Sequence, residues 1–262
     1  SLLHDVIASA SVPVVRLTEI FRQAKESHIV LNAHRVNRGE FPHLTPFGMA
    51  DFAFIECEDP EAIRGQVAAL VTRQIPERYG LDSLKDIQVI TPMNRGPLGT
   101  TALNQELQTT LNPDGEVITG SQLRVGDRVM QVRNNYDKEV YNGDVGWIVR
   151  MDPEEQQVWI RFDQAEVIYD VSDWQELQLA YAISVHKSQG SEYPAVVFLL
   201  HTSHYVMLQR NLLYTALSRG RRLVVMVGTR QAVAIAVRSA RTRERYSRLP
   251  DRLRRHLAGK AS

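Results

Sequence analysis

Residues His186–Glu192 combine an imidazole, an ammonium group, hydroxyls, an amide, a glycine and a carboxylate within seven positions. One apolar run precedes this segment and another follows it, so we expect it at a strand end, where open α/β sheets bind their ligands. Gly190 would let the backbone approach a phosphate or a sugar closely, and Lys187 and Ser188 could hold a phosphodiester. The alternative is a polar surface loop without a ligand. The variety of side chains favours a binding site.

A second candidate is Arg219, which follows the segment Tyr214–Ser218. A guanidinium group is planar and permanently charged, so it can bind two phosphate oxygens at once, whereas a lysine offers a point charge. The alternative is that Arg219 only begins a basic surface. From Arg219 onward the chain carries twelve arginines and one lysine, against Glu244 and Asp251. Such a stretch indicates either contact with phosphates or a solvated surface.

These two segments resemble motifs of superfamily 1 helicases. Tyr181–Tyr193 is similar to motif V in the form seen in RecD-like helicases and in conjugative relaxase-helicases, and Asn211–Gly220 is similar to motif VI. The resemblance implies that Arg219 is a catalytic arginine finger on the γ-phosphate of ATP, a role worth roughly 10³–10⁵ in rate. It also implies a division of motif V, in which the DNA-facing residues are His186, Lys187 and Ser188 and the ATP-facing residues are Gln189, Gly190 and Glu192.

Two earlier segments extend the resemblance. Leu17–Ala24 is similar to motif IV, which implies that Arg22 is a second catalytic residue that senses the γ-phosphate of ATP. From spacing alone, Arg22 could equally form an ion pair with a nearby glutamate. Val89–Gly96 is similar to a strand end that touches the DNA backbone. This similarity implies DNA contacts from Thr91, Pro92 and Asn94.

The segments that must position these residues alternate between strand and helix patterns. Near-continuous apolar runs at 87–90, 195–200 and 223–227 are typical of parallel strands covered on both faces. A strand is also expected over 12–17, and helices are expected over 60–80, 100–111, 206–218 and 229–241. We therefore predict an α/β fold, a RecA-like parallel-sheet domain with an inserted small SH3-like β-barrel. The predicted motor domain covers 1–111 and 176–262, and the barrel covers 112–175.

The predicted barrel resembles domain 2B of RecD-like helicases, which helps to close over single-stranded DNA. Its segment Asn134-Asn135-Tyr136 offers two amides and a ring that could stack on a base, although a purely structural hairpin is the favoured alternative. Residues 112–173 include thirteen acidic side chains against six basic ones. Because like charges repel, the barrel cannot grip phosphates generally. Any contact with DNA should therefore be local.

The overall composition is that of an ordinary globular protein, with 44% hydrophobic and 23% charged residues among 262 and a net charge of +1. No apolar run reaches the roughly 18 residues that span a bilayer, so no membrane partner is expected. The single cysteine, Cys57, excludes an internal disulfide and fits a reducing compartment. We expect a cytoplasmic monomer, and we expect no metal ligands in this chain.

The pattern GxxxxGK[ST] of a phosphate loop is missing from the sequence. The resemblance implies that ATP and its Mg²⁺ are held mostly by an N-terminal motor domain of the same protein. We therefore expect the C-terminal half of an ATP-dependent 5′–3′ DNA helicase that translocates on single-stranded DNA and is inactive alone. One alternative is a non-catalytic module that binds DNA or protein. Another is the helicase domain of a conjugative relaxase.

Overall fold

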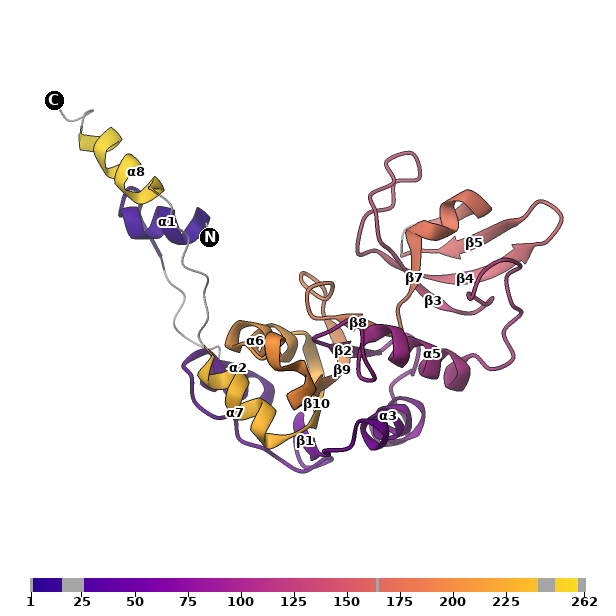
Figure 1. Cartoon of the computed structure of the whole chain (residues 1–262), viewed down its shortest axis with the longest axis horizontal. Helices are drawn as coiled ribbons and strands as arrows, with labels where there is room; N and C mark the ends of the chain where they lie inside the picture. Colours follow the sequence, from indigo (N-terminus) through magenta and orange to yellow (C-terminus); the bar gives the residue numbers. More distant parts are fainter. Residues whose placement is uncertain (1, 16–25, 164, 240–247, 259–262) are drawn as a thin grey trace. The chain divides into compact units, whose positions relative to one another are not determined.

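The computed structural model describes residues 2–15, 26–163, 165–239 and 248–258. The chain divides into two units, one of residues 1–25 with 241–262 and one of residues 26–240, and each is described by itself. The smaller unit contains helices α1 (Leu2–Ser9) and α8 (Leu249–Ala258). The larger unit contains a parallel sheet and an antiparallel sheet (Figure 1).

Five parallel strands form the first sheet, in the order β1-β10-β9-β2-β8. Their bounds are β1 (Phe52–Glu56), β2 (Ile87–Thr91), β8 (Ala182–Ser184), β9 (Tyr193–Leu200) and β10 (Gly220–Gly228). At the end of β10, Gly228 pairs with Leu200. Gly228 has φ +150, and a Cβ atom there would lie 1.9 Å from the Leu200 carbonyl oxygen. Only glycine permits this approach of two strands.

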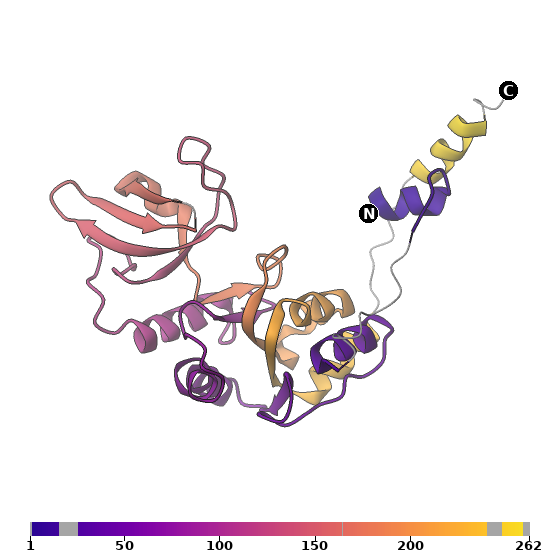
Figure 2. The ribbon, with the colours of Figure 1, turned by 180° about the vertical axis from the view of Figure 1, so that it is seen from behind.

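Helices cover both faces of this sheet (Figures 1 and 2). Helices α2 (His28–Asn37), α6 (Arg210–Leu217) and α7 (Arg230–Arg238) pack on one face, and α3 (Pro60–Ala69) and α5 (Thr100–Leu111) pack on the other. Side chains alternate along the strands, so Val224 and Met226 contact the first helix layer and Val225 the second. These three layers confirm the predicted RecA-like fold. None of the helices in the described ranges has the length and apolar character to cross a membrane.

The predicted helix over 60–80 contains an irregular turn. A π-turn, Leu70–Gln74, separates α3 from α4 (Ile75–Tyr79). Pro76 has no N–H to donate to the carbonyl of Thr72, so the regular α-helical ladder cannot continue there. Gly80 then ends the helix in a left-handed conformation, with φ +63.

Three other boundaries differ from the sequence prediction. Residues 12–15 form no strand, and 16–17 lie outside the described residues. Helix α6 begins only at Arg210, because Gln209 is extended, and a 3-10 helix, Thr202–Met207, precedes it. Helix α7 ends at Arg238, where Ser239 is again extended. The backbone conformation of single residues sets these ends of helices and strands, and the spacing of apolar residues does not predict that conformation.

The second sheet is antiparallel, with strand order β6-β5-β4-β3-β7. Its strands are β3 (Arg128–Gln131), β4 (Val145–Asp152), β5 (Gln157–Arg161), β6 (Glu166–Asp170) and β7 (Leu177–Leu179). A separate hydrophobic core lies within it and includes the fully buried Tyr169, whose hydroxyl donates to Gln131 Oε1 at 3.0 Å. The predicted small β-barrel is thus present. The domain boundaries at 112 and 175 stay a prediction.

A buried carboxylate, Asp127, joins the barrel to the parallel-sheet domain. Asp127 is fully buried, and each of its carboxylate oxygens accepts two hydrogen bonds. The donors are Gln108 Nε2 at 2.6 Å, the Arg124 amide at 2.7 Å, Asn112 Nδ2 at 2.8 Å and the Tyr181 hydroxyl at 2.9 Å. Burial, together with this carboxylate, raises the pKa of Tyr181 and so keeps its hydroxyl protonated as a donor. Helix α5, the barrel and the segment before β8 therefore meet at one group.

The next residue, Arg128, is a buried cation. Its Nη1 donates to the carbonyls of Leu84 and Ile87 at 3.0 and 3.1 Å, and its guanidinium lies 5.9 Å from the ring centroids of both Trp147 and Tyr193. Burial lowers the pKa of Arg128. Within the described part of the chain no carboxylate forms an ion pair with it. Carbonyl oxygens and aromatic faces therefore stabilise this charge.

The Asp127 junction gives a stability prediction. Replacing Asp127 by Ala leaves several buried donors without an acceptor, so we expect the free energy of unfolding to fall by about 2–4 kcal/mol. Urea unfolding followed by tryptophan fluorescence would measure it. Asp163→Ala, at an exposed position of the same barrel, should change stability by no more than about 0.5 kcal/mol. Equal effects of the two substitutions would contradict the role of Asp127.

A buried histidine gives a second prediction, on pH. His204 is 2% exposed, and burial, with a smaller contribution from His201, lowers the pKa of His204 to about 4. Its ordinary value is 6.5, so between these two pH values the unfolded chain binds a proton that the folded chain does not. Stability should therefore be complete above pH 6.5 and fall as the pH drops towards 4, by about 3 kcal/mol from this group.

The measurement is the free energy of unfolding at a series of pH values, for the unaltered chain and for His204→Gln. The difference between their pH slopes isolates this residue from the carboxylates, which titrate in both proteins. His256→Gln, at an exposed position, is the control and should keep the original slope. If His204→Gln also keeps that slope, the buried imidazole is not the cause.

Candidate nucleic-acid and nucleotide interface

The candidate binding segment is the loop between β8 and β9, residues 185–192. It starts beside the carboxyl end of β2, where Ser184 pairs with Thr91, and the Val185 amide donates to the Thr91 carbonyl at 3.2 Å. It ends at the amino end of β9, where Tyr193 pairs with Gly220. Because β8, β2 and β9 are parallel, the loop runs back along the whole length of the strands. Its first residue therefore lies at the carboxyl end of β8 and its last residue at the amino end of β9, while Ser191 lines one cleft together with His186 and Lys187.

The first turn of the loop is held by its own backbone. The amides of Lys187 and Ser188 donate to the Ser184 carbonyl at 3.0 and 3.1 Å. Ser188 is fully buried, and its hydroxyl donates to the Val185 carbonyl at 2.8 Å. This hydroxyl is used inside the turn, although the sequence predicts a DNA contact for it. The side chain of His186, in contrast, is exposed.

Gly190 completes the turn. Its φ of +89 lies in the left-handed region, and a Cβ atom there would meet nothing within 4 Å. Glycine is therefore required by backbone conformation, and open space remains in front of it. Gln189 is exposed beside it. These observations are compatible with the predicted approach of a nucleotide.

Lys187 connects this turn to the barrel. Its Nζ donates to Asn142 Oδ1 in the loop between β3 and β4. A cleft of about 340 Å³ lies between the two loops, lined by residues 142–144 of the barrel with His186, Lys187, Gln189 and Ser191. The acceptor of the Lys187 ammonium group, Asn142 Oδ1, belongs to a neutral amide, so the positive charge of Lys187 is not cancelled. The sequence showed Asn142-Gly143-Asp144 only as a turn signal and gave no reason to pair it with Lys187.

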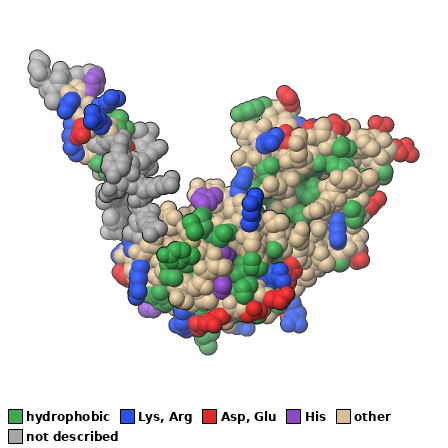
Figure 3. Space-filling view, viewed as in Figure 1, with side chains coloured by type: hydrophobic (Ala, Val, Ile, Leu, Met, Phe, Trp, Pro, Cys, Tyr) green, Lys and Arg blue, Asp and Glu red, His purple; other side chains and the backbone are tan. Residues whose placement is uncertain are grey.

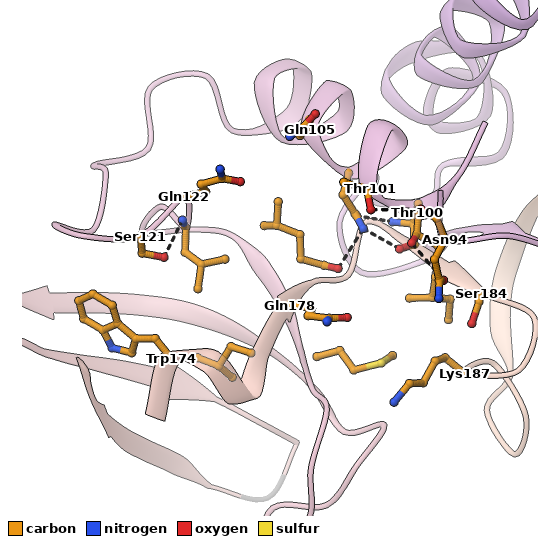
Figure 4. Close-up of a pocket in the computed structure, with 17 residues that line it drawn as sticks. Asn94, Thr100, Thr101, Gln105, Ser121, Gln122, Trp174, Gln178, Ser184 and Lys187 are labelled. Atoms are coloured by element: carbon orange, nitrogen blue, oxygen red, sulfur yellow. Dashed lines mark hydrogen bonds between the residues drawn. The ribbon is translucent and has the colours of Figure 1, made fainter. Parts of the chain in front are cut away.

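A larger cavity of about 430 Å³ lies between α5, β8 and the barrel (Figure 4). The parallel-sheet domain lines it with polar groups that include Asn94, Thr100, Thr101, Ser184 and Lys187. The barrel side contributes the apolar Leu123, Met130 and Trp174 together with the polar Ser121, Gln122 and Gln178. A cation and an aromatic ring in one cavity suit the phosphate and the base of a nucleotide. The sequence did not indicate Thr100, Thr101 or Trp174 as site residues.

Of the three residues predicted at the end of β2, only Asn94 is exposed. Its Oδ1 accepts from the Thr100 hydroxyl at 3.3 Å, and its backbone carbonyl accepts from the Thr101 amide at 3.2 Å, so it is fixed against the start of α5. Thr91 is fully buried, and its hydroxyl donates to the Leu98 carbonyl at 2.7 Å. Pro92 is also buried. Both residues shape the loop that presents Asn94.

The barrel hairpin uses its two asparagines internally. Asn134 Oδ1 accepts from the Asn142 amide at 3.0 Å, and Asn135 Nδ2 donates to Glu176 at 3.2 Å. The ring of Tyr136 is 73% exposed and stands edge-on to Tyr141, with centroids 6.1 Å apart. The amides therefore shape the hairpin, and the ring of Tyr136 is the group available to a ligand.

The rest of the barrel surface carries acidic side chains, many of them along its outer edge (Figure 3). The exposed acidic residues of the barrel include Asp137, Glu139, Asp144, Glu154, Glu155, Asp163, Glu166 and Asp170. This distribution agrees with the expectation that a DNA contact by the barrel is local. The lysine that lines both clefts, Lys187, belongs to the parallel-sheet domain.

Arg219 lies at the other end of the loop. It is half-buried, and its guanidinium donates to the Ser191 carbonyl at 2.9 Å, the Ser218 hydroxyl at 3.0 Å and the Thr215 carbonyl at 3.2 Å. The Tyr193 amide donates to the Arg219 carbonyl at 2.8 Å. Motif VI therefore holds the end of motif V through two hydrogen bonds. All three acceptors of the guanidinium are neutral, so its charge is not cancelled.

Glu192 is the carboxylate of this end. It is exposed and forms an ion pair with Arg221 at 2.6 Å. The second predicted phosphate residue, Arg22, lies outside the described residues. No group of three or more metal-binding side chains occurs in the ranges that the structure describes.

Two family models match segments of the chain. The model described as the ATP-dependent RecD-like DNA helicase SH3 domain matches residues 103–162, and the model described as the UvrD-like helicase C-terminal domain matches residues 179–227. The first covers most of the barrel strands, and the second covers β8, the loop, β9, α6 and most of β10.

Curated relatives agree with these models. The chain is 37% identical to the ATP-dependent RecD2 DNA helicase of Deinococcus radiodurans over 93% of its own length and 32% of that protein. It is 31% identical to the RecBCD enzyme subunit RecD of Mycolicibacterium smegmatis, over 68% of its own length and 31% of that protein. The chain thus spans about a third of the length of these relatives.

A solved structure with the same fold is the Pif1 helicase of Candida albicans, with a TM-score of 0.50 and 16% identity over 94% of this chain and 61% of that one. Together, the three-layer sheet, the inserted barrel and the two matched segments are similar to the C-terminal region of RecD-like helicases. The chain belongs with the C-terminal regions of RecD-like helicases.

Proposed function

We propose that the chain is the second motor half of an ATP-dependent DNA helicase that moves 5′ to 3′ along single-stranded DNA. One observation supports this most strongly. The single loop 185–192 carries Lys187 beside the barrel clefts at one end and contacts Arg219 at the other. A movement at the nucleotide end of such a loop can reach the DNA end through covalent bonds alone.

On the nucleotide side, the donor set fits a triphosphate. The Arg219 guanidinium is bonded only to neutral oxygens, so phosphate oxygens with full negative charge would bind it more strongly. Arg22 is proposed to act beside it, and Gln189, Gly190 and Glu192 are proposed to contact the rest of ATP. The ATP-bound Mg²⁺ neutralises phosphate charge and would be held mostly by a first motor domain. This chain alone is then not expected to hydrolyse ATP.

The link to DNA follows from the Ser191 contact. We infer that the Arg219 guanidinium releases the Ser191 carbonyl when it turns towards a phosphate, which would free the end of the loop. The loop can then shift His186 and Lys187 relative to Asn94 and the barrel. Alternation between these two positions would tighten and loosen the hold on a single strand. The 5′–3′ direction is the polarity of RecD-like helicases and is proposed here on family membership.

The first test concerns Arg219, in a protein that joins this chain to a motor domain bearing a phosphate loop. Arg219→Ala should lower DNA-stimulated ATP turnover by at least about 100-fold, because the finger is lost at the transition state. Arg219→Lys should restore only a small part, because a point charge lacks the guanidinium geometry. Steady-state phosphate release measures both variants.

Arg230→Ala is the matched control. Arg230 is exposed and forms an ion pair with Glu56 at the carboxyl ends of the strands, away from Arg219. ATP turnover by the Arg230→Ala variant should stay near normal. Turnover that also stays near normal in Arg219→Ala would remove Arg219 from the catalytic machinery.

The second test concerns single-stranded DNA and uses the present chain. Lys187→Ala should weaken binding of labelled oligo-dT and make the plot of log affinity against log salt shallower by about 0.7, the value for one lost phosphate contact on a single strand. His186→Ala should weaken binding with little change in this slope, because the substitution removes a hydrogen-bonding ring and no lysine or arginine charge.

Fluorescence anisotropy at several salt concentrations measures both effects. Lys85→Ala is the control, since Lys85 is exposed near the amino end of β2, at the opposite edge of the sheet. A loss in Lys85→Ala equal to that in Lys187→Ala would show that only net charge matters. Binding that depends wholly on residues 241–262 would instead favour the non-catalytic module.

A further inference from the structure

The smaller unit carries a basic surface that the proposed motor function does not use. With 3.6 residues per turn, Arg248, Arg252 and Arg255 fall within roughly 60° of one another around the axis of helix α8. Leu249 and Leu253 fall on another side of the helix. Arg248 is the residue before the helix, and its carbonyl accepts from the Arg252 amide at 3.0 Å. We call Arg248, Arg252 and Arg255 the arginine stripe.

The apolar side of α8 is already covered. Helices α1 and α8 pack against each other within this unit, and Arg254 Nη2 donates to the Ala8 carbonyl at 2.7 Å. Leu249 and Leu253 are half-buried, whereas all three arginines of the stripe are exposed. An amphipathic helix that binds a membrane must offer its apolar face to the lipid. Because α1 packs on α8 and both leucines are half-buried, the exposed side chains of the stripe are the more available surface.

Within the described residues, the arginine stripe forms no ion pair. Asp251, the carboxylate of α8, stands three positions from Arg248 and four from Arg255, but it pairs with Arg254 at 3.6 Å, outside the stripe. Across the described residues, no side-chain hydrogen bond or ion pair engages Arg248, Arg252 or Arg255. Like charges three and four positions apart on a helix repel each other. A bound polyanion would remove this repulsion, so its binding free energy would be more favourable than with cations scattered over a surface.

The spacing and chemistry of the stripe favour duplex DNA as that polyanion. The three arginines extend along roughly 10 Å of helix axis, at 1.5 Å per residue. Duplex DNA presents about one charge per 1.7 Å of its axis, the higher density of the two DNA forms. An acidic protein partner would normally also need an apolar or aromatic anchor, and the stripe itself consists of arginines alone.

We propose that α8 binds the phosphate backbone of double-stranded DNA through Arg248, Arg252 and Arg255. This surface is separate from the residue 185–192 loop and would hold the duplex while the motor region handles the single strand. The proposal does not depend on Arg219 or on ATP turnover. The proposed duplex binding and the proposed motor function can therefore each fail without the other.

The test measures affinity of the whole chain for a labelled duplex between about 50 and 200 mM salt. In the triple substitution Arg248→Gln, Arg252→Gln and Arg255→Gln, the slope of log affinity against log salt should become shallower by about 2–3, close to 0.9 per lost contact. The matched control replaces three exposed arginines elsewhere by glutamine, with the same change in net charge: Arg38, Arg73 and Arg230. The control slope should change by less than about 1.

A second set of variants separates charge from folding. Lysine at the three stripe positions keeps the positive charges, so this variant should retain most of the slope of log duplex affinity against log salt. If the glutamine variant lost its slope through a structural defect, charge-preserving substitutions would not be expected to retain it. Lys187→Ala should keep the duplex slope while it loses affinity for oligo-dT, which separates this surface from the proposed motor groove. Glutamine and arginine have similar helix propensity, so the far-ultraviolet circular dichroism should not change.

Three results would overturn the proposal. The stripe and control triples could lower the duplex slope equally, which would leave only net charge as the cause. The stripe triple could weaken binding of oligo-dT and spare the duplex, which would assign the stripe to single strands. It could also abolish binding of a poly-glutamate peptide and leave both DNA slopes intact, which would assign it to an acidic protein.

Discussion

The structure depends on one pair of buried charges, Asp127 and Arg128, at the junction of the barrel and the parallel sheet. Among the residues that the structure describes, neither forms a simple ion pair: neutral donors surround the carboxylate, and carbonyls and rings surround the guanidinium. A buried charge is tolerated only where its partners are fixed in position. The barrel can therefore be docked in few orientations. The buried amide of Asn104 adds to this constraint, because it bonds the backbone of Leu179 at the end of β7 and of Ala182 at the start of β8.

This fixed junction also helps to position the loop 185–192. Tyr193 touches Arg128 at the amino end of β9, and Lys187 touches Asn142 in the barrel. The loop is thus tied to the barrel near both of its ends, while Arg219 holds it from the opposite direction through Ser191. Two parts of the chain that are far apart in sequence, the barrel at Asn142 and the segment at Arg219, therefore meet on this loop. Such an arrangement makes the loop sensitive to changes on either side of the sheet.

The sequence predicted the layers of the fold well and the role of individual side chains less well. Strands such as β9 and β10 are evident because burial on both faces needs continuous apolar residues, and α5 was predicted with its observed ends. The π-turn near Pro76 and the late start of α6 depend on single backbone conformations that apolar spacing does not encode. Motif similarity found the residue 185–192 loop and Arg219. It could not reveal that Thr91 and Ser188 use their hydroxyls internally, because those partners are backbone carbonyls, or that Asn142 reaches Lys187 across 45 positions.

Gly228 has no functional group, yet it limits which sequences can form this domain. Its hydrogen atom faces the Leu200 carbonyl, and its own carbonyl accepts from the Cys57 amide at 2.9 Å, so β1, β9 and β10 all close around it. Thr229 follows at once and caps α7. Any side chain at position 228 would push apart three strands and displace that cap together. Substitution of Gly228 is therefore excluded by the geometry of the sheet, and invariance at this position would report that geometry and not a catalytic role.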